Sequence, residues 1–383
     1  MIDQLASMEV RARELEGREA AERSAVGRPE LPIVLYGSGP LGQMTQSRLR
    51  HIGATALAFA DSNPQRWGTS IDGVPILAPE EAVRRYGENA RFVVTIYNGS
   101  AVRRQLAQAG VQNVSHFADL YFDHAADFLP FCGLAARSTV LDAWPEVVRA
   151  SGVWHDQRSR AEFLAQLDWR LRVGGVQMPR PDSPAECYFP TDLFTYREDE
   201  ALFDCGAFDG DSLRQYLARS PVGGARKIIA FEPDAQSYCR LSAYVAGLDP
   251  ALVGQVRTEP WAVADSTGEV RFSALGSVSS GLADDGSVRV HAVALDEIDV
   301  VPSLIKMDVE GFELPALKGA SNRLRANLPV LAISLYHHAS DLWSIPNFLE
   351  ELVPAYNLYL RRYAEDCWEL VLYAVPADRV LKS

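Results

Sequence analysis

The chain has 383 residues, 48% of them hydrophobic, which is enough for a large buried core and for two or three domains. Its formal net charge is −13, which excludes nucleic acid as an expected partner because phosphate binding needs a basic face. No apolar run reaches membrane length and the N-terminus has no signal-peptide pattern, so we expect a cytoplasmic protein that does not enter a membrane.

The first third of the chain predicts a helix followed by a small α/β domain. Residues 1–28 are charged, rich in alanine and free of proline, which is typical of a solvated surface helix or a dimer contact. Residues 29–121 then predict a Rossmann-like domain. Its expected elements are a strand at 31–36, the loop Gly37-Ser-Gly39-Pro-Leu-Gly42, a helix to about residue 52, a strand at 56–60 ending in Asp61, and strands at 91–96 and 113–116, making a sheet of about four strands.

The loop Gly37 to Gly42 and Asp61 together match the dinucleotide-binding pattern of strand, Gly-x-Gly-x-x-Gly, helix, strand and acid. Against this, Pro40 removes a backbone donor that a pyrophosphate would use, and no catalytic pair for hydride transfer follows. The domain also resembles the small Rossmann-like domains attached to sugar-modifying enzymes, whose pocket can hold a nucleotide-sugar. A structural or docking role, a nucleotide or nucleotide-sugar site, and an NAD site all stay open.

Residues 122–187 predict a helical connector, because they hold many charges but few strand-like runs. Trp144, Trp154 and Trp169 lie here, and packing is favoured over an aromatic substrate platform. The proline-rich stretch 179–184 marks the end of the connector. The segment 188–194 that follows is a candidate lid.

Residues 188–383 predict a second domain, organised around another glycine loop. An apolar run ends in Asp204, and Gly206 and Gly210 precede a predicted helix. Glycine at such a turn lets the main chain approach a ligand closely. The next strand, 227–231, ends in Glu232-Pro233, and a carboxylate at that strand tip can accept both hydroxyls of a ribose. A nucleoside is therefore the predicted ligand.

Two nucleoside cofactors compete for this loop. The spacing Gly-x-x-x-Gly is looser than the dinucleotide pattern. Asp204, Asp209 and Asp211 would repel a pyrophosphate, but they suit the cationic sulfonium and amino groups of S-adenosylmethionine. The composition of the loop therefore favours S-adenosylmethionine over NAD.

Three motifs carry a resemblance to a known family: Asp204-Cys-Gly-Ala-Phe-Asp-Gly210, Phe231-Glu-Pro-Asp234, and Ile305-Lys-Met-Asp-Val-Glu-Gly-Phe-Glu313 with Leu317-Lys-Gly-Ala320 after it. With them, residues 188–376 resemble the FkbM family of S-adenosylmethionine-dependent O-methyltransferases. The resemblance implies an α/β fold with a class I methyltransferase Rossmann-like sheet. It implies cofactor contacts from the residues of the first two motifs, namely Asp204, Gly206, Ala207, Gly210, Glu232 and Pro233.

The rest of this domain follows the same fold. After a strand at 256–259, Asp265 is assigned to the adenine amino group by resemblance to methyltransferases of this fold, and a turn aspartate is the alternative. The runs 269–272 and 288–293 alternate like a hairpin, and the family places that hairpin near the cofactor, with Ser279 and Ser280 as candidate contacts. The last two runs, 356–363 and 368–375, predict an antiparallel hairpin that ends a sheet of seven strands.

The chemistry is expected where the strands 304–308 and 329–336 end, because the carboxyl ends of parallel strands line the ligand crevice. Asp308, Glu310 and His337 are the candidate catalytic residues. A neutral histidine or an ionised carboxylate can accept the proton of an acceptor hydroxyl. Alternatively, Mg²⁺ held by Asp308, Glu310 or a histidine can lower the pKa of that hydroxyl. The buried position expected for Lys306 requires a partner, which is Asp308, Asp204 or a substrate oxygen.

The sequence thus predicts an S-adenosylmethionine-dependent O-methyltransferase acting on a small-molecule hydroxyl, in a sugar, a glycan precursor or a polyketide-like secondary metabolite. The alternative is a protein that binds a nucleotide-sugar or NAD and carries a non-catalytic methyltransferase-like domain. The five cysteines form no Cys-x-x-Cys pair, so no zinc site is predicted. A homodimer stays an open expectation.

Overall fold

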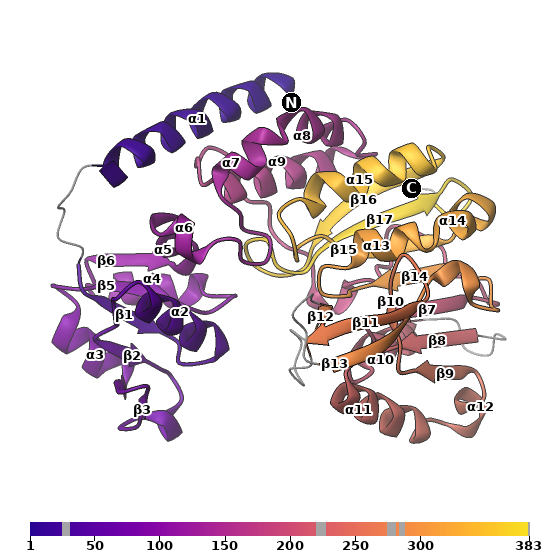
Figure 1. Cartoon of the computed structure of the whole chain (residues 1–383), viewed down its shortest axis with the longest axis horizontal. Coiled ribbons are helices and arrows are strands. Elements are labelled where there is room, and N and C mark those ends of the chain that lie inside the picture. Colours follow the sequence, from indigo (N-terminus) through magenta and orange to yellow (C-terminus); the bar gives the residue numbers. More distant parts are fainter. Residues whose placement is uncertain (25–30, 220–226, 274–280, 283–287, 382–383) are drawn as a thin grey trace. The chain divides into compact units, whose positions relative to one another are not determined.

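The computed structural model describes residues 1–24, 31–219, 227–273, 281–282 and 288–381, which form two compact units (Figure 1). The N-terminal unit comprises Ala6–Asp142 and Trp169–Val173. The C-terminal unit comprises Met1–Leu5, Ala143–Asp168 and Gly174–Ser383. Residues 122–187, expected as one connector, are therefore divided between the two units.

The N-terminal unit contains a six-stranded sheet with the order β3-β4-β2-β1-β5-β6. Its strands are β1 Ile33–Tyr36, β2 Ala58–Ala60, β3 Ser70–Ile71, β4 Val74–Leu77, β5 Arg91–Val94 and β6 Asn113–His116. The four predicted strands are present, but the expectation of about four strands missed β3 and β4. Strand β3 has only two residues, and Ser70 of β3 pairs with Pro75 of β4. A proline in such a short stretch is typical of a turn, so the sequence did not predict two strands here.

Seven α-helices lie within the described part of residues 1–142. They are α1 Ile2–Ser24, α2 Pro40–His51, α3 Pro79–Tyr86, α4 Ser100–Gln108, α5 Phe117–Asp123, α6 Ala125–Phe128 and α7 Arg137–Asp142. Helix α2 begins at Pro40, inside the predicted loop Gly37 to Gly42, and ends at His51, close to the predicted residue 52. Over all the described residues, no helix combines the length and the apolar character that a membrane crossing requires.

The C-terminal unit contains a seven-stranded sheet with the order β16-β17-β15-β14-β7-β8-β9. Its strands are β7 Ala201–Cys205, β8 Lys227–Phe231, β9 Val256–Glu259, β14 Leu304–Met307, β15 Val330–Ser334, β16 Tyr356–Arg362 and β17 Leu370–Pro376. The first five of these in chain order pair in parallel, and β17 lies antiparallel between β15 and β16. This confirms the predicted methyltransferase-type sheet with its terminal hairpin.

Eight α-helices lie within the described part of residues 143–381, and five of them connect consecutive parallel strands of the seven-stranded sheet. The eight are α8 Trp144–Ser151, α9 Gln157–Leu171, α10 Asp211–Arg219, α11 Ala235–Ala246, α12 Pro250–Val253, α13 Glu313–Lys318, α14 Ser321–Asn327 and α15 Asp341–Leu352. Part of the expected connector packs onto them, since Asn347 of α15 donates a hydrogen bond to the carbonyl of Glu146 in α8 at 2.9 Å. The backbone N–H of His155 also donates to the carbonyl of Leu358 in β16 at 2.8 Å.

A second, four-stranded sheet in this unit has the order β10-β13-β11-β12. Its strands are β10 Ala262–Val263, β11 Gly268–Ser273, β12 Gly281–Leu282 and β13 Val288–Val293. Strands β11 and β13 are antiparallel, which confirms the predicted hairpin. Ser279 and Ser280 lie outside the described residues, so their contact with a cofactor stays a prediction.

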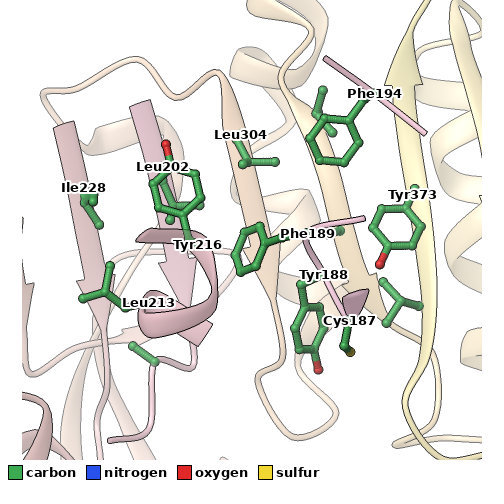
Figure 2. Close-up of a cluster of buried hydrophobic side chains, with 14 of the residues drawn as sticks. Cys187, Tyr188, Phe189, Phe194, Leu202, Leu213, Tyr216, Ile228, Leu304 and Tyr373 are labelled. Atoms are coloured by element: carbon green, nitrogen blue, oxygen red, sulfur yellow. The ribbon is translucent and has the colours of Figure 1, made fainter. Parts of the chain in front are cut away.

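The segment 188–194, expected as a lid, is anchored in the core instead (Figure 2). Phe189 and Phe194 are buried with Leu202 of β7 and Tyr216 of α10 in one hydrophobic cluster. Burial of one large apolar side chain stabilises a fold by about 1.5–3 kcal/mol. This anchoring holds the segment, including Tyr188, in a fixed place beside the carboxyl ends of the strands.

Candidate active site

The second glycine loop follows β7 and packs directly against the loop after β14. Gly206 and Gly210 have φ angles of 78° and 90°, a region that strongly favours glycine. A Cβ atom on Gly206 would lie only 1.8 Å from the backbone oxygen of Asp308. Glycine at position 206 is therefore required for the close packing of the two loops, independently of any ligand.

Asp204 forms a buried ion pair with Lys306, its direct neighbour across the sheet. The Lys306 Nζ lies 3.3 Å from Asp204 Oδ1, and the two side chains are 2% and 0% exposed. Burial alone would lower the pKa of Lys306, but the charges of Asp204 and Asp308 raise it above its usual value. Ser212 donates to the other Asp204 oxygen at 2.6 Å. Because the Asp204 carboxylate is fully buried against Lys306 and Ser212, it does not fit the predicted direct contact with a cofactor. It stabilises the glycine loop from within the protein instead.

Glu232 lies at the tip of β8, as predicted. Its Oε2 accepts the backbone N–H of Phe208 and its Oε1 accepts that of Asp234, both at 2.8 Å. Burial raises the pKa of this carboxyl to about 7. Each carboxylate oxygen has a second lone pair, so Glu232 retains the capacity to accept the hydroxyls of a ribose. Pro233 follows it half-buried, and Ala207 is buried beneath the loop.

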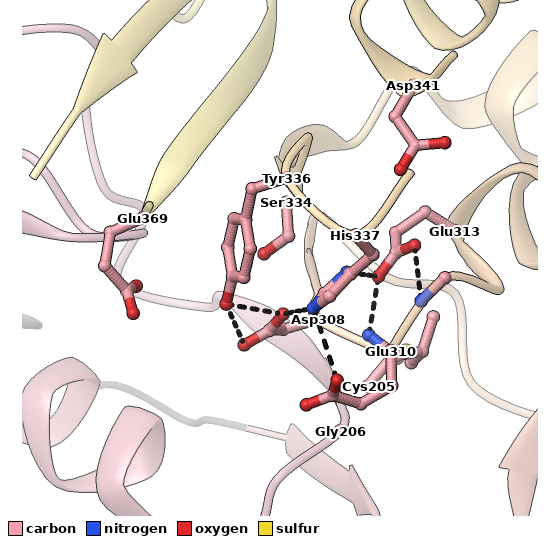
Figure 3. A network of polar contacts seen from close by, with 12 residues as sticks. Cys205, Gly206, Asp308, Glu310, Glu313, Ser334, Tyr336, His337, Asp341 and Glu369 are labelled. Atoms are coloured by element: carbon pink, nitrogen blue, oxygen red, sulfur yellow. Dashed lines mark hydrogen bonds and ion pairs between the residues drawn. The ribbon is translucent and has the colours of Figure 1, made fainter. Parts of the chain in front are cut away.

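Asp308 is the centre of a polar network at the end of β14 (Figure 3). The Tyr188 hydroxyl donates to its Oδ2 at 2.9 Å, and the Tyr336 hydroxyl donates to its Oδ1 at 3.2 Å. Burial opposes ionisation of Asp308, but the positive charges of His337 and Lys306 hold its pKa below the usual value. The structure therefore places an ionised carboxylate at the predicted position.

His337 is held by Glu313, a residue that the sequence motif contains but that was not predicted in the site. The Nδ1 atom of His337 lies 2.9 Å from Glu313 Oε1. Glu313 is fully buried and also accepts the backbone N–H groups of Val309 at 2.8 Å and Gly311 at 3.1 Å. Burial would lower the pKa of His337, but Glu313, Asp308 and Glu310 raise it to about 10. A histidine that is protonated at neutral pH cannot accept a proton, so the predicted role as a neutral base does not fit these surroundings.

Glu310 completes the predicted set at this strand edge. Its Oε2 lies 3.6 Å from His337 Nε2, and its backbone has a φ of 55°, which is uncommon for a residue with a side chain. Burial, together with the charge of Asp308, raises the pKa of Glu310 to about 8. The structure thus brings Asp308, Glu310 and His337 together.

Asp265 lies elsewhere. It follows β10 in the second sheet and is exposed, and Ser266 Oγ donates to its Oδ1 at 3.2 Å. The tip of β9 is instead Glu259, whose backbone oxygen accepts the N–H of Glu232 at 3.0 Å. The chain changes sheets between these two residues, so the alternative of a turn aspartate fits Asp265 better than an adenine contact.

Comparison with known proteins identifies the domain that carries this site. Residues 204–364 match the family model of the methyltransferase FkbM domain. This part of the chain belongs to the FkbM methyltransferase family. The predicted family is therefore confirmed for residues 204–364.

Two relatives of the FkbM domain extend this result. Hexuronic acid methyltransferase AglP of Haloferax volcanii is 27% identical over 163 residues, which are 40% of this chain and 63% of that protein. The chain thus matches less than two thirds of that relative's length. The crystal structure of an FkbM methyltransferase from Methylobacillus flagellatus KT, 20% identical, covers 97% of this chain and 99% of its own with a TM-score of 0.75. That likeness confirms the fold.

The sequence reasoning missed three residues of the FkbM site, which are Tyr188, Tyr336 and Glu313. Tyr336 directly precedes His337 in the chain, and Glu313 lies in the same motif as Asp308. Both residues could therefore have been predicted from their closeness in sequence to candidate site residues. Tyr188 comes from a segment 120 residues before Asp308. Only the packing of that segment into the core brings its hydroxyl to Asp308.

The N-terminal glycine loop, outside the FkbM domain, uses its acidic residue internally. Asp61 accepts the backbone N–H of Ser38 at 2.9 Å and that of Asn63 at 2.8 Å, and Arg66 lies 3.3 Å away. The Ser38 hydroxyl also donates to Asp61. Three of these contacts, two from Ser38 and one from Arg66, converge on Asp61 Oδ2. A dinucleotide would need this carboxylate for a ribose, so the geometry does not favour the NAD interpretation of this loop.

Proposed function

We propose that this FkbM-family protein is an S-adenosylmethionine-dependent O-methyltransferase that acts on a small-molecule hydroxyl. The observation that supports this most strongly is the ionised carboxylate of Asp308 at the end of β14, beside the loop that starts at Gly206. The chemistry of the edge fits the cofactor. Asp308 provides negative charge for a sulfonium, and Glu232 provides acceptors for a ribose.

The proposed reaction requires the loss of one proton from the acceptor. Bound S-adenosylmethionine supplies an electrophilic methyl group, and transfer replaces the acceptor O–H bond with an O–CH₃ bond while the S–CH₃ bond breaks. The products are the methyl ether, S-adenosylhomocysteine and the proton. The Asp308 carboxylate accepts this proton, because it lies at the strand edge where substrates of α/β sheets bind. Alignment of the reacting atoms lowers much of the remaining barrier.

For the acceptor we propose a sugar hydroxyl. The hexuronic acid methyltransferase of Haloferax volcanii supports this choice, since its matching part is 27% identical to this chain. A polyketide or other secondary-metabolite hydroxyl is the second candidate from the sequence, and no specific observation favours it.

A thermal-shift panel tests the cofactor. A ligand that binds only the native state raises the melting temperature, so S-adenosylmethionine and S-adenosylhomocysteine are expected to raise it, whereas NAD is expected to leave it unchanged. Nucleotide-sugars in the same panel report on the N-terminal glycine loop. A shift produced by NAD alone would overturn the proposed function.

The raised pKa of Glu232 predicts that cofactor binding depends on pH. Below pH 7 the carboxyl is increasingly protonated, and above it the carboxylate accepts the ribose hydroxyls better. The affinity for S-adenosylhomocysteine, measured by calorimetry, is therefore expected to rise between about pH 6 and about pH 8.

The matched variant for this measurement is Glu232→Gln, which keeps the shape of the side chain but does not titrate. It is expected to bind more weakly and to lose the part of the pH dependence that is centred near pH 7. An identical pH profile in both proteins would show that the ribose lies elsewhere.

A further inference from the structure

The hydrogen bond from Tyr188 to Asp308 is shorter than the one from Tyr336. The Tyr188 hydroxyl donates to Asp308 Oδ2 at 2.9 Å, whereas the Tyr336 hydroxyl lies 3.2 and 3.4 Å from the two carboxylate oxygens. The Asp308 side chain is nevertheless 22% exposed. Tyr188 therefore holds this carboxylate from the protein side, while part of the same group stays open to solvent.

The direction of the hydrogen bonds around Tyr188 follows from its single hydroxyl proton. Tyr188 gives this proton to Asp308, because an ionised carboxylate cannot donate. The Tyr188 hydroxyl also lies 3.1 Å from Ser334 Oγ, so in this pair of hydroxyls Ser334 is the donor. Donation from Ser334 polarises the Tyr188 hydroxyl and strengthens its hydrogen bond to Asp308.

The backbone of Tyr188 lies in the left-handed region, with a φ of 62°, which is uncommon for a residue with a large side chain. Such a conformation persists where the surroundings fix it, and it is frequent at functional sites. Here Phe189 and Phe194 anchor the following residues in the core, and Lys306 Nζ lies 5.2 Å from the centre of the Tyr188 ring. A bond with Ser334 alone would satisfy the buried hydroxyl, so its bond to Asp308 has a further role.

We propose that Tyr188 is a positioning residue for methyl transfer, whose hydroxyl, polarised by Ser334, fixes the Asp308 carboxylate where it accepts the proton of the acceptor. The inference deepens the proposed function and rests on it for the role of Asp308. Such alignment matters, because displacement of a reacting group by about 1 Å can slow an enzyme about 100-fold. Tyr188 precedes the residues 204–364 that match the FkbM domain, so the proposed site includes a segment outside that match.

The variant Tyr188→Phe tests this role in the full chain, because it removes the hydroxyl and keeps the ring. The lost hydrogen bond is to a charged group, so kcat is expected to fall about 10- to 100-fold. The KM for the sugar acceptor and the affinity for S-adenosylhomocysteine are expected to stay close to wild type, because the effect is confined to the reacting carboxylate.

The matched control is Tyr363→Phe. It also removes a buried hydroxyl from the same hydrophobic cluster, where Tyr363 and Tyr373 form a hydrogen bond of 2.7 Å. A wild-type kcat is expected for this control, since neither tyrosine of that pair forms a hydrogen bond with Asp308 in the part of the chain that the structure describes.

A double-mutant cycle separates positioning from a structural effect. If Tyr188 acts through Asp308, then Tyr188→Phe is expected to change kcat little further in a protein that already carries Asp308→Asn. Independent effects would multiply instead. A wild-type kcat in Tyr188→Phe, or its full further loss in the double variant, would overturn the positioning role.

Ser334→Ala decides the question if Tyr188→Phe does not fold, as judged by circular dichroism. It removes the donor to the Tyr188 oxygen, and kcat is expected to fall about two- to tenfold, the usual effect of losing a neutral hydrogen bond. An unchanged kcat would again overturn the inference. Failure of the proposed function is a different result, because the wild-type protein itself would then release no S-adenosylhomocysteine with any sugar.

Discussion

The substitution Lys306→Met is expected to destabilise the C-terminal unit by about 3–5 kcal/mol, the usual effect of removing one partner from a buried ion pair. Lys306 Nζ lies 3.3 Å from Asp204 and also donates to the backbone oxygen of Gly206 at 2.6 Å. Methionine fills similar volume, so the loss is electrostatic: the Asp204 carboxylate stays buried without its counter-charge. Urea denaturation followed by circular dichroism measures the change.

The double variant that carries Asp204→Asn and Lys306→Met is the control for this prediction. It removes both charges, and replacing a whole buried pair by neutral groups is often close to neutral in stability. The double variant is therefore expected to be more stable than Lys306→Met alone. If the two variants are equally destabilised, the effect comes from packing and the lysine is not a charge partner of Asp204.

Most strands of the C-terminal sheet could be predicted from the sequence. The strands at 227–231 and 256–259 were predicted with the bounds that the structure shows. The first is a short apolar run, as expected for a parallel strand buried on both faces. The terminal hairpin was predictable because its two runs have strand-like composition and a turn between them. The N-terminal strands β3 and β4 were missed because β3 has only two residues and because Pro75 and the turn at Asp72 and Gly73 are typical of a loop.

The sequence also predicted that the candidate catalytic residues meet at one edge of the sheet, but it did not predict their protonation states. Asp308, Glu310 and His337 follow neighbouring parallel strands, so topology alone brings them to one edge. The protonation of His337 depends on Glu313, and the burial of Asp204 depends on Lys306. These pairings form only when loops and strands pack, and no residue spacing along the chain specifies them.

Replacing Asp308 with asparagine is expected to slow methyl transfer by about 10²- to 10⁴-fold, the usual contribution of a group that accepts a proton in the reaction. The change removes the negative charge beside His337 but keeps a carbonyl oxygen that can accept a hydrogen bond from Tyr188 or Tyr336. We therefore expect the fold and the affinity for S-adenosylhomocysteine to stay close to wild type. The rate is measured as S-adenosylhomocysteine released with the sugar acceptor that gives the fastest wild-type turnover.

The control variant is Asp199→Asn, which removes one negative charge from an exposed residue of the same unit. It controls for the general effect of net charge on a cationic cofactor, and wild-type rates are expected. Equal rates in wild type and Asp308→Asn would remove Asp308 from the reaction. If the variant instead lost S-adenosylhomocysteine binding together with turnover, Asp308 would act in holding the cofactor. Retained binding with lost turnover would show that its charge acts on the acceptor, as expected of the proton acceptor.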